Sequence, residues 1–451
     1  MLTKNVATQA RHDAGGSSDP AKCHPDTRVA ILTDLEEWAS DTMSSYPIKW
    51  MSGSAGVGKT AIMRTTAETL EERNLLLADF FFWRTGERCN SAEFIIATLA
   101  YQITISIPET RPYIERSVEK DPHIFSKSLK AQAMALIVDP ITQLLHIQRL
   151  PFNYPRVIMV DGLDECLEAR TLSQDAERQR EVLQVLYLVI KLLPAPFYLL
   201  IASRPENHIQ SMFHTILQDI ASSIMLNDSY NADDDIRTFY VNKFREIREH
   251  HPLRSCLPSS GWPSQETIDR LVYHACGQFI YASTVVKFVG ASKKNPLIRL
   301  NAILDVKVRG NTRPFQAVDR LYSTIFLSIE DEDLPATLRV LGILLLGRST
   351  DISGSSLSHG FPPTCFPPAF WGHFLGLHQG EVQRLMLGLE SVLSVQGPND
   401  QSFHFYHASL QDFLFDVSRS GPFRISRSRT FEDLAKQAIH HLSTTDGEYF
   451  L

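Results

Sequence analysis

Short apolar runs and stretches with helical spacing alternate along the first half of the chain. Five apolar runs are typical of strands buried on both faces of a parallel sheet: residues 48–52, 75–83, 157–160, 197–203 and 224–227. Residues 61–73 and 93–107 carry apolar side chains three or four positions apart, as one face of a helix does. Because strands alternate with helices, the pattern predicts an α/β domain with a parallel sheet and helices on both sides.

The second half of the chain has mainly helical spacing. Residues 233–248 and 265–289 each predict a helix, and residues 381–395 predict an amphipathic helix. The apolar run at 340–346 predicts a buried helix or strand. The segments "SVLSV" and "FHFYH" predict two strands joined at residues 397–400, "GPND". We therefore expect a helical region followed by a part that contains a two-stranded hairpin.

Composition narrows the class of protein. At 451 residues the chain has room for roughly three domains, and its 43% hydrophobic content can build their cores. The net charge of -7 argues against bulk electrostatic attraction to nucleic acid or acidic lipid. The six cysteines include no C-x-x-C pair, so they predict neither a zinc site nor a disulfide framework. Because the sequence contains neither a signal peptide nor an uninterrupted apolar run long enough to span a membrane, we expect a cytoplasmic protein.

Residues 53–60, "GSAGVGKT", match the phosphate-binding pattern G-x-x-x-x-G-K-[ST]. Glycines let the backbone fold tightly with its N–H groups pointing inward, where they and the N-terminus of the next helix form an anion cradle. Lys59 would reach the β- and γ-phosphates, and the Thr60 hydroxyl would bind Mg²⁺. A chance match is expected about one time in a hundred, and here a predicted strand precedes the loop and a predicted helix follows it. The predicted nucleotide-binding residues are Gly53, Ser54, Ala55, Gly56, Val57, Gly58, Lys59, Thr60 and Ala61.

A second acidic motif, "RVIMVDGLDEC" at residues 156–166, follows the apolar run of a central strand. Asp161 at the end of that run would hold Mg²⁺, together with Thr60. Glu165 is the better candidate for orienting or deprotonating the attacking water, and Asp164 is a candidate helper. The alternative is an acidic surface turn after a strand, which the joint occurrence of the two motifs disfavours.

A third candidate lies in "FYLLIASRPE", residues 197–206, where an apolar strand ends close to Arg204. A guanidinium group at a strand tip beside the nucleotide could read the γ-phosphate, because its planar donors match phosphate oxygens well. The alternative for Arg204 is an ordinary surface salt bridge.

These motifs carry a resemblance to a known group of proteins. Together with "CHPDTR" at residues 23–28, they resemble fungal NACHT domains and the related nephrocystin-type N-terminal NTPase module, which belong to the STAND class of signalling P-loop ATPases. The resemblance continues in "CGQFIYAST" at 276–284 and in "HASLQDFLFDVSRSGPFRI" at 407–425, which is similar to a winged-helix signature. It covers about residues 23–450. It implies an AAA+/STAND-type P-loop core at 23–228, a helical domain at 229–310 and a winged-helix domain at 311–451.

The resemblance implies a switch rather than a fast catalyst. ATP and Mg²⁺ would favour an open arrangement, and ADP, held in part by His407 of the winged helix, would favour a closed one. The alternative for His407 is a purely structural histidine in a wing strand. The implied partners are ATP and either further copies of the chain in a nucleotide-dependent oligomer or unknown proteins.

A winged helix raises the alternative of DNA binding. Residues 371–451 contain six Lys or Arg against nine Asp or Glu, which opposes attraction to a phosphate backbone. The composition therefore favours a packing role and predicts no nucleic-acid partner. ATP is favoured over GTP because the guanine-reading pattern N-K-x-D is missing: residues 242–245 read "NKFR".

The sequence also departs from the usual STAND plan. Residues 1–22, with "GGSSDP", predict a disordered tail, and no repeat of 20 to 50 residues is found. Residues 349–368 predict an irregular insertion. The chain is thus expected to be either a minimal module or a shortened gene model. Two other functions stay open beside the switch: a stand-alone ATPase, and a scaffold that nucleotide merely stabilises.

Overall fold

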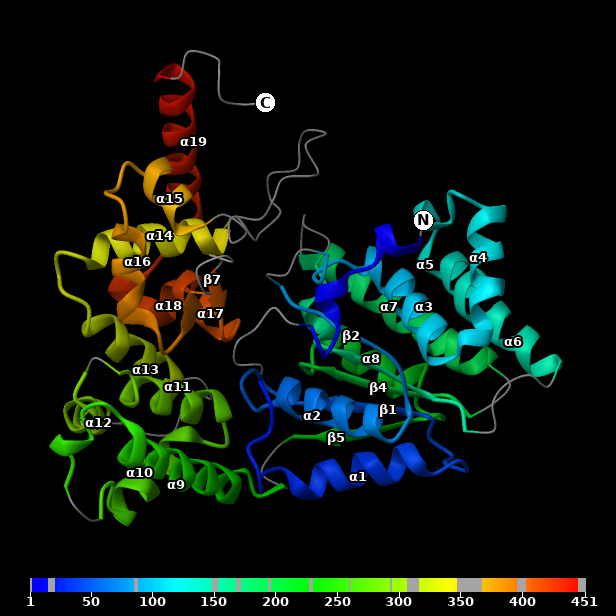
Figure 1. Ribbon diagram of the computed structural model, residues 1–451, viewed down its shortest axis with the longest axis horizontal. Helices are drawn as coiled ribbons and strands as arrows, with labels where there is room; N and C mark the ends of the chain where they lie inside the picture. The colour runs from blue at the N-terminus through cyan, green and yellow to red at the C-terminus, as the bar shows by residue number, and fades with distance from the viewer. Residues whose placement is uncertain are drawn as a thin grey trace. The chain divides into compact units, whose positions relative to one another are not determined.

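The protein is described from a computed structural model, which divides into two compact units, Met1–Tyr230 and Asn231–Leu451 (Figure 1). The structure describes residues 2–14, 21–84, 88–147, 153–167, 172–193, 196–226, 230–258, 261–292, 294–305, 316–346, 367–395 and 403–444.

The first unit is built on a five-stranded parallel sheet. Its strands are β1 (Ile48–Ser52), β2 (Leu76–Phe81), β3 (Val157–Asp161), β4 (Tyr198–Ser203) and β5 (Ala221–Met225). Their order is β2-β3-β4-β1-β5, so β4 lies between the strand that precedes the glycine loop and the strand that ends in the acidic motif. The predicted parallel sheet is confirmed. Two strands differ from their predicted bounds by more than one residue: β2 is shorter than the predicted 75–83, and β5 begins at Ala221 rather than residue 224. The first residues of β5 are small or polar, which hides a strand at the edge of a sheet from hydrophobic patterning.

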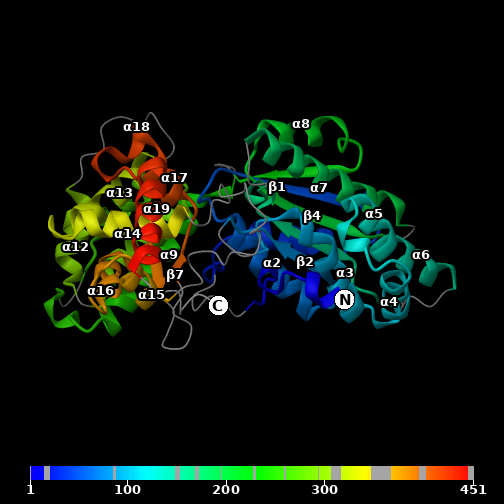
Figure 2. The ribbon, with the colours of Figure 1, turned by 90° about the horizontal axis from the view of Figure 1, so that it is seen from above.

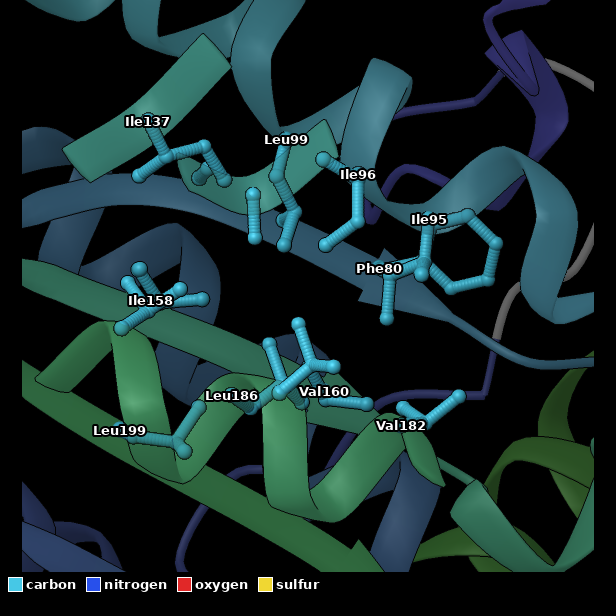
Figure 3. Close-up of a cluster of buried hydrophobic side chains, with 14 of the residues drawn as sticks. Phe80, Ile95, Ile96, Leu99, Ile137, Ile158, Val160, Val182, Leu186 and Leu199 are labelled. Atoms are coloured by element: carbon cyan, nitrogen blue, oxygen red, sulfur yellow. The ribbon is translucent and has the colours of Figure 1, made fainter. Parts of the chain in front are cut away.

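Helices cover both faces of this sheet, as predicted (Figure 1). They are α1 (Val29–Ser40), α2 (Lys59–Glu72), α3 (Ile95–Ser106), α4 (Arg111–Lys120), α5 (Leu129–Ala133), α6 (Asp139–His146), α7 (Leu172–Leu192) and α8 (Asn207–Thr215), with a π-helical turn at Met134–Val138. Side chains alternate along each strand: Ile158 and Val160 of β3 pack with α3 and α7, whereas Val157 and Met159 pack with α1 and α2. Figure 3 shows the first of these two cores, where Leu99 and Leu186 meet the strands.

The N-terminus contradicts the predicted disordered tail. Residues 2–14 form short 3-10 helices at Leu2–Asn5 and Thr8–Ala10, and Ala7 and Ala10 are buried in the core beside α3. The Ala7 N–H donates to the Thr98 hydroxyl at 2.9 Å. The prediction of disorder is therefore wrong for residues 2–14, because three buried apolar residues in a short segment do not form a readable period. The "GGSSDP" stretch, residues 15–20, lies outside the described residues.

The second unit begins with helices α9 (Ala232–His250), α10 (Gln265–Ala275), α11 (Phe279–Val289), α12 (Pro296–Leu304), α13 (Gln316–Leu327) and α14 (Leu334–Leu346). The predicted single helix over 265–289 is wrong, since Cys276 and Gly277 adopt the left-handed conformation (φ 47 and 71) and split it into α10 and α11. Such a conformation ends a helix. The apolar run at 340–346 is helical and forms the buried end of α14.

The remainder of the second unit contains α15 (Pro368–Phe374), α16 (Glu381–Met386), β6 (Leu393–Val395), β7 (Phe403–Phe405), α17 (Ser409–Phe415), α18 (Val417–Ser420) and α19 (Arg427–Thr444). The two predicted strands are confirmed as an antiparallel pair with Leu393 opposite Phe405. The helix predicted over 381–395 is wrong beyond Leu389, because Leu393 to Val395 join this pair instead. The predicted turn at 397–400 and residues 349–366 of the predicted insertion lie outside the described residues.

One hydrophobic core runs through the second unit. It includes Tyr240 of α9, Tyr322 of α13 and Phe413 of α17. Two bidentate ion pairs reinforce it, Arg419 with Asp319 and Arg339 with Asp433. The second pair joins α14 to α19, two helices that pack against each other (Figure 2). The division predicted at residue 310 stays a prediction.

Candidate functional site

The glycine loop joins β1 to α2 in the predicted strand–loop–helix order. Gly56 and Gly58 have φ values of 83 and 98, which side-chain-bearing residues rarely adopt. At Gly53 a Cβ atom would lie 2.9 Å from Cγ2 of Val57. Glycines are thus required at these positions, and the loop delivers the chain directly into the 14-residue helix α2. The N–H groups at that helix start favour an anion.

Lys59 is held inside this loop. Its Nζ donates to the carbonyl oxygens of Gly53 at 2.8 Å and Ser54 at 3.0 Å. Burial lowers the pKa of Lys59, while the nearby carboxylates of Asp164 and Asp161 act in the opposite direction. The ammonium group therefore lies at the edge of the sheet where β1 and β3 end, on either side of β4.

Asp161 ends β3 and is buried, with 2% of its surface exposed. Burial raises the pKa of Asp161 to about 7, against the effect of its hydrogen bond with the Thr60 hydroxyl. The sheet thus brings together the two residues predicted to hold the metal, one from β3 and one from α2.

The residues present fit Mg²⁺. Oδ1 of Asp161 is buried and has no hydrogen-bond partner, and the Thr60 hydroxyl lies beside the same carboxylate. A hard cation of this kind prefers oxygen ligands and usually takes only one or two from the protein, with phosphates and waters completing the octahedron. In keeping with that pattern, the described residues contain no group of three or more His, Cys, Asp or Glu that could hold a metal alone.

Gly162 explains the turn that follows Asp161. Its φ is +69, and a Cβ atom there would lie 2.9 Å from the carbonyl oxygen of Phe82. Only glycine lets the chain pass this close to the end of β2. The short 3-10 turn Leu163–Glu165 follows at once and carries the other two acidic candidates.

Glu165 is half-buried and anchored to the connection that follows β2. Its Oε2 accepts a hydrogen bond from the backbone N–H of Arg84 at 3.1 Å. Burial raises the pKa of Glu165, and the neighbouring Asp164 adds to the rise. A carboxylate with a raised pKa beside a phosphate loop has the property required of a general base.

Asp164 does not stand free beside Glu165. Its Oδ1 accepts from the backbone N–H of Arg204 at 2.9 Å, and its Oδ2 lies 3.2 Å from Nε of the same arginine. Both side chains are largely buried, with exposed fractions of 5% and 20%. Asp164 therefore positions Arg204 and ties the end of β3 to the end of β4. Arg204 thus forms a salt bridge, but a largely buried one and not the surface salt bridge considered as the alternative. Its contact with the γ-phosphate stays a prediction.

Several residues that support the site were not predicted from the sequence. Arg28, 5% exposed, donates from Nη2 to the carbonyl of Val57 in the glycine loop at 2.9 Å. Gln179 of α7 donates to the carbonyls of Asp164 at 3.2 Å and Cys166 at 2.9 Å, and its Oε1 bonds with His208. The motif "CHPDTR" ends in Arg28 and could have drawn attention to it, whereas nothing in the sequence marks Gln179.

His407 lies in the second unit, directly after β7. Its Nδ1 accepts a hydrogen bond from the Ser409 backbone N–H at 3.0 Å and bonds with the Ser409 hydroxyl at 2.7 Å. That hydroxyl also bonds with the Tyr322 hydroxyl at 2.7 Å. Because a backbone N–H can only donate, Nδ1 carries no proton, and the neutral ring holds its proton on Nε2. The predicted contact of His407 with a diphosphate stays a prediction.

Comparisons with known proteins agree with this geometry in part. A family model described as nephrocystin 3, N-terminal, matches residues 27–204, which is less than half of the chain. No curated protein sequence matches the chain significantly.

Solved structures include loosely similar chains. One is the ORC2 protein of Aeropyrum pernix in ADPNP–ADP complexes, with 13% identity, a TM-score of 0.32, and 94% of this chain and 98% of that chain covered. Another is Cdc6p of Pyrobaculum aerophilum, with 12% identity, a TM-score of 0.37, and coverage of 93% and 97%. A third, from Drosophila ORC bound to DNA, has 12% identity, a TM-score of 0.31, and coverage of 89% and 97%.

Three features identify the first unit as a P-loop NTPase domain: the glycine loop, the strand order and the Thr60–Asp161 pair. The family model that matches residues 27–204 covers these motifs. No helix among the described residues is long and apolar enough to cross a membrane.

Proposed function

We propose that this protein is an ATP-binding switch of the NACHT/STAND class, of the fungal kind, with slow hydrolysis of ATP to ADP. The observation that carries the proposal is the convergence of four predicted side chains at one edge of the sheet. Lys59 interacts electrostatically with Asp164, Asp161, Arg204 and Glu165, which come from β3, the turn after it and β4.

The chain's own residues have separate tasks in this proposal. Residues 53–61 bind the phosphates through backbone N–H groups and the Lys59 ammonium. Thr60 and Asp161 hold Mg²⁺, which neutralises phosphate charge when bound. Glu165 orients the attacking water and accepts its proton, and Arg204, held by Asp164, contacts the γ-phosphate.

The switch requires a nucleotide to bind one arrangement of the protein better than another. Moving an equilibrium from 1:99 to 99:1 needs about 5.5 kcal/mol of preference, which several charge-assisted contacts changing together can supply. We assign one such contact to His407, in a winged-helix domain formed around β6 and β7. A neutral ring with its proton on Nε2 offers a hydrogen-bond donor to an ADP oxygen without adding a full charge.

The proposed partners are ATP and either copies of this chain in a nucleotide-dependent oligomer or other proteins in the cytoplasm. Nucleic acid is not proposed, because the winged-helix region carries more acidic than basic residues. ATP is preferred to GTP on the missing guanine pattern alone. A stand-alone ATPase would instead be monomeric with steady turnover, and a nucleotide-stabilised scaffold would bind partners equally well as Glu165→Gln.

The test is the mass of the protein in solution with ADP or with a slowly hydrolysed ATP analogue, for wild type and for Lys59→Ala. We expect a larger species only for wild type with the analogue. A Lys22→Ala variant, which removes a half-exposed lysine that pairs with Glu68, is the matched control and should behave as wild type. Identical masses in all samples, despite nucleotide binding by wild type in calorimetry, would exclude the oligomerising switch.

A further inference from the structure

Residues 2–14 form what we call the N-terminal strap. It lies against α3 through the bond from Ala7 to Thr98, and its residue His12 reaches between β2 and α2. The Arg88 guanidinium donates to the carbonyl of Lys4 at 2.9 Å, which ties the strap to the connection between β2 and α3. The strap thus contacts three elements of the NTPase unit.

His12 is the main polar anchor of the strap. Its Nδ1 forms a short hydrogen bond with Oδ2 of Asp79, and its Nε2 lies 3.2 Å from Oε2 of Glu71. The side chains of His12 and Asp79 are 1% and 0% exposed, whereas Glu71 is 56% exposed. Ionised carboxylates only accept hydrogen bonds, so an imidazolium, whose two ring nitrogens both donate, matches this pair of partners.

The surroundings of this ion pair leave Asp79 dependent on His12. From α3, the neutral Gln102 bonds to the backbone N–H and carbonyl of Asp79 at 3.0 and 2.7 Å, which seals this edge of β2 but adds no charge. The other charged groups nearby are Glu71 and Arg64 from α2 and Asp13 from the strap itself. A buried carboxylate that loses its main counter-charge is strongly destabilising.

The strap is also connected to the catalytic turn. Arg88, which holds the carbonyl of Lys4, belongs to the same connection as Arg84, whose N–H holds Glu165. Within that connection the Trp83 N–H donates to the Cys89 carbonyl at 3.1 Å, and Asn90 accepts from Leu167, just beyond the catalytic turn, at 2.8 Å. Movement of the strap would therefore be transmitted to Glu165.

We propose that the strap is a proton-dependent latch that positions Glu165. With His12 charged, the strap is docked and the connection after β2 holds Glu165 in place. When His12 loses its proton, the buried Asp79 loses its main counter-charge, the strap is released, and Glu165 is no longer held. The part of this proposal that concerns turnover rests on the proposed function, whereas the docking does not.

The direction of the pH dependence follows from the contacts of His12. Burial alone would lower the pKa of His12, but the hydrogen bond to Asp79 and its charge outweigh burial and raise the pKa above the ordinary 6.5. Docking is therefore fully present below pH 6.5 and is lost as pH rises through the raised value.

Hydrogen exchange of the full chain tests the docking. Corrected for intrinsic rates, amides of residues 5–14 should be protected at pH 6 and should lose this protection at pH 9, because docking raises the pKa of His12. His12→Gln should lose this protection at both pH values, whereas His24→Gln, at a histidine whose Nδ1 bonds with the neighbouring Pro25 carbonyl, should match wild type. Equal protection of wild type at both pH values, or full protection in His12→Gln, would overturn the proposal.

Steady-state kinetics test the link to Glu165. Arg88→Ala removes the tie to Lys4 without touching the nucleotide loop, and we expect kcat to fall several-fold with KM unchanged. An unchanged kcat in a folded Arg88→Ala variant would also overturn the proposal. If wild type instead bound no nucleotide, the proposed function would fail while the exchange experiment still decided whether the strap docks.

Discussion

In the first unit the candidate site is assembled from the ends of three neighbouring strands, whereas in the second unit His407 is held by residues close to its own hairpin. Three site residues lie at or beyond the ends of strands that are adjacent in the sheet. Lys59 follows β1, Asp161 ends β3 and Arg204 follows β4. The ring of His407 is fixed by Ser409, two residues away, and through it by Tyr322.

This difference shows which kind of functional site can be predicted from a sequence. In a parallel sheet, all strands end at the same edge, so motifs far apart in sequence meet there once the strands are recognised. The ring of His407 is instead held by Ser409 and, through it, by Tyr322 of α13. The nucleotide contact proposed for His407 would depend on how the two units are arranged, which a motif does not specify.

We expect the largest effect from a substitution that removes a catalytic group of the first unit without altering its shape. Glu165→Gln keeps the hydrogen-bond acceptor for the Arg84 N–H but cannot take a proton from water, so we expect ATP hydrolysis to fall about a thousandfold. ATP affinity should stay roughly unchanged, because the phosphates are held by residues 53–61. Hydrolysis of radiolabelled ATP and calorimetry measure the two quantities.

The control is Glu206→Gln, at an exposed acidic residue just beyond β4, which should hydrolyse ATP as wild type does. Unchanged hydrolysis in Glu165→Gln would remove this residue from catalysis. Both units would then have binding roles only, instead of one catalytic and one sensing role.

Much of the first region could be predicted from the sequence because its signals are local. Glycines at fixed positions, a lysine and a threonine at a helix start, and an aspartate at the end of an apolar run each appear within a few residues. The role of Asp164 could not be predicted, since its partner Arg204 is 40 residues away and only the sheet brings them together.

Other features depended on tertiary structure in the same way. The order of the strap could not be predicted, because the residues that anchor it lie far from it in the sequence. Its anchors are a bond to Thr98 and an ion pair with Asp79. The break between α10 and α11 was missed because the apolar spacing continues across Cys276 and Gly277, and only their left-handed conformation reveals the turn.

A second prediction compares one glycine from each region. Gly162 and Gly376 have nearly equal φ values, +69 and +67, but an added Cβ would meet the Phe82 carbonyl at 2.9 Å in the first and nothing within 4 Å in the second. Both alanine variants incur the cost of a left-handed residue, about 1 kcal/mol. Gly162→Ala should lose at least about 2 kcal/mol of unfolding free energy, since backbone must also shift.

Urea unfolding of both variants gives the two free energies, and Gly376→Ala serves as the control for backbone strain. Equal losses would mean that the close approach of β2 to the catalytic turn has no energetic consequence. Hydrolysis by the surviving folded fraction of Gly162→Ala should also fall, because the turn carries Glu165.

The third prediction concerns the buried carboxylate of Asp161. Its pKa is raised from 3.8 to about 7, so the folded state binds more protons than the unfolded state between these values. Stability without nucleotide should therefore fall as pH rises from about 4 to about 7. Asp161→Asn should flatten this slope, measured by thermal unfolding at several pH values.

Mg²⁺ with nucleotide sharpens this prediction, because a bound cation stabilises the ionised carboxylate. Wild type should gain more thermal stability from the ligands at pH 8 than Asp161→Asn does. An equal gain in the two proteins would place the metal away from Asp161, and the metal assignment would then be wrong.

The smallest effect is expected at His407 in the second unit. It decides whether this residue belongs to the nucleotide site. If neutral His407 donates from Nε2 to ADP, glutamine can replace it, because its amide also donates and does not titrate. We expect His407→Gln to keep the ratio of ADP to ATP-analogue affinity, and His407→Leu to reduce that ratio about fivefold, the lower end of typical coupling between sites. Calorimetry at pH 7 measures both affinities. A ratio that leucine leaves intact would make His407 a purely structural residue of the hairpin region.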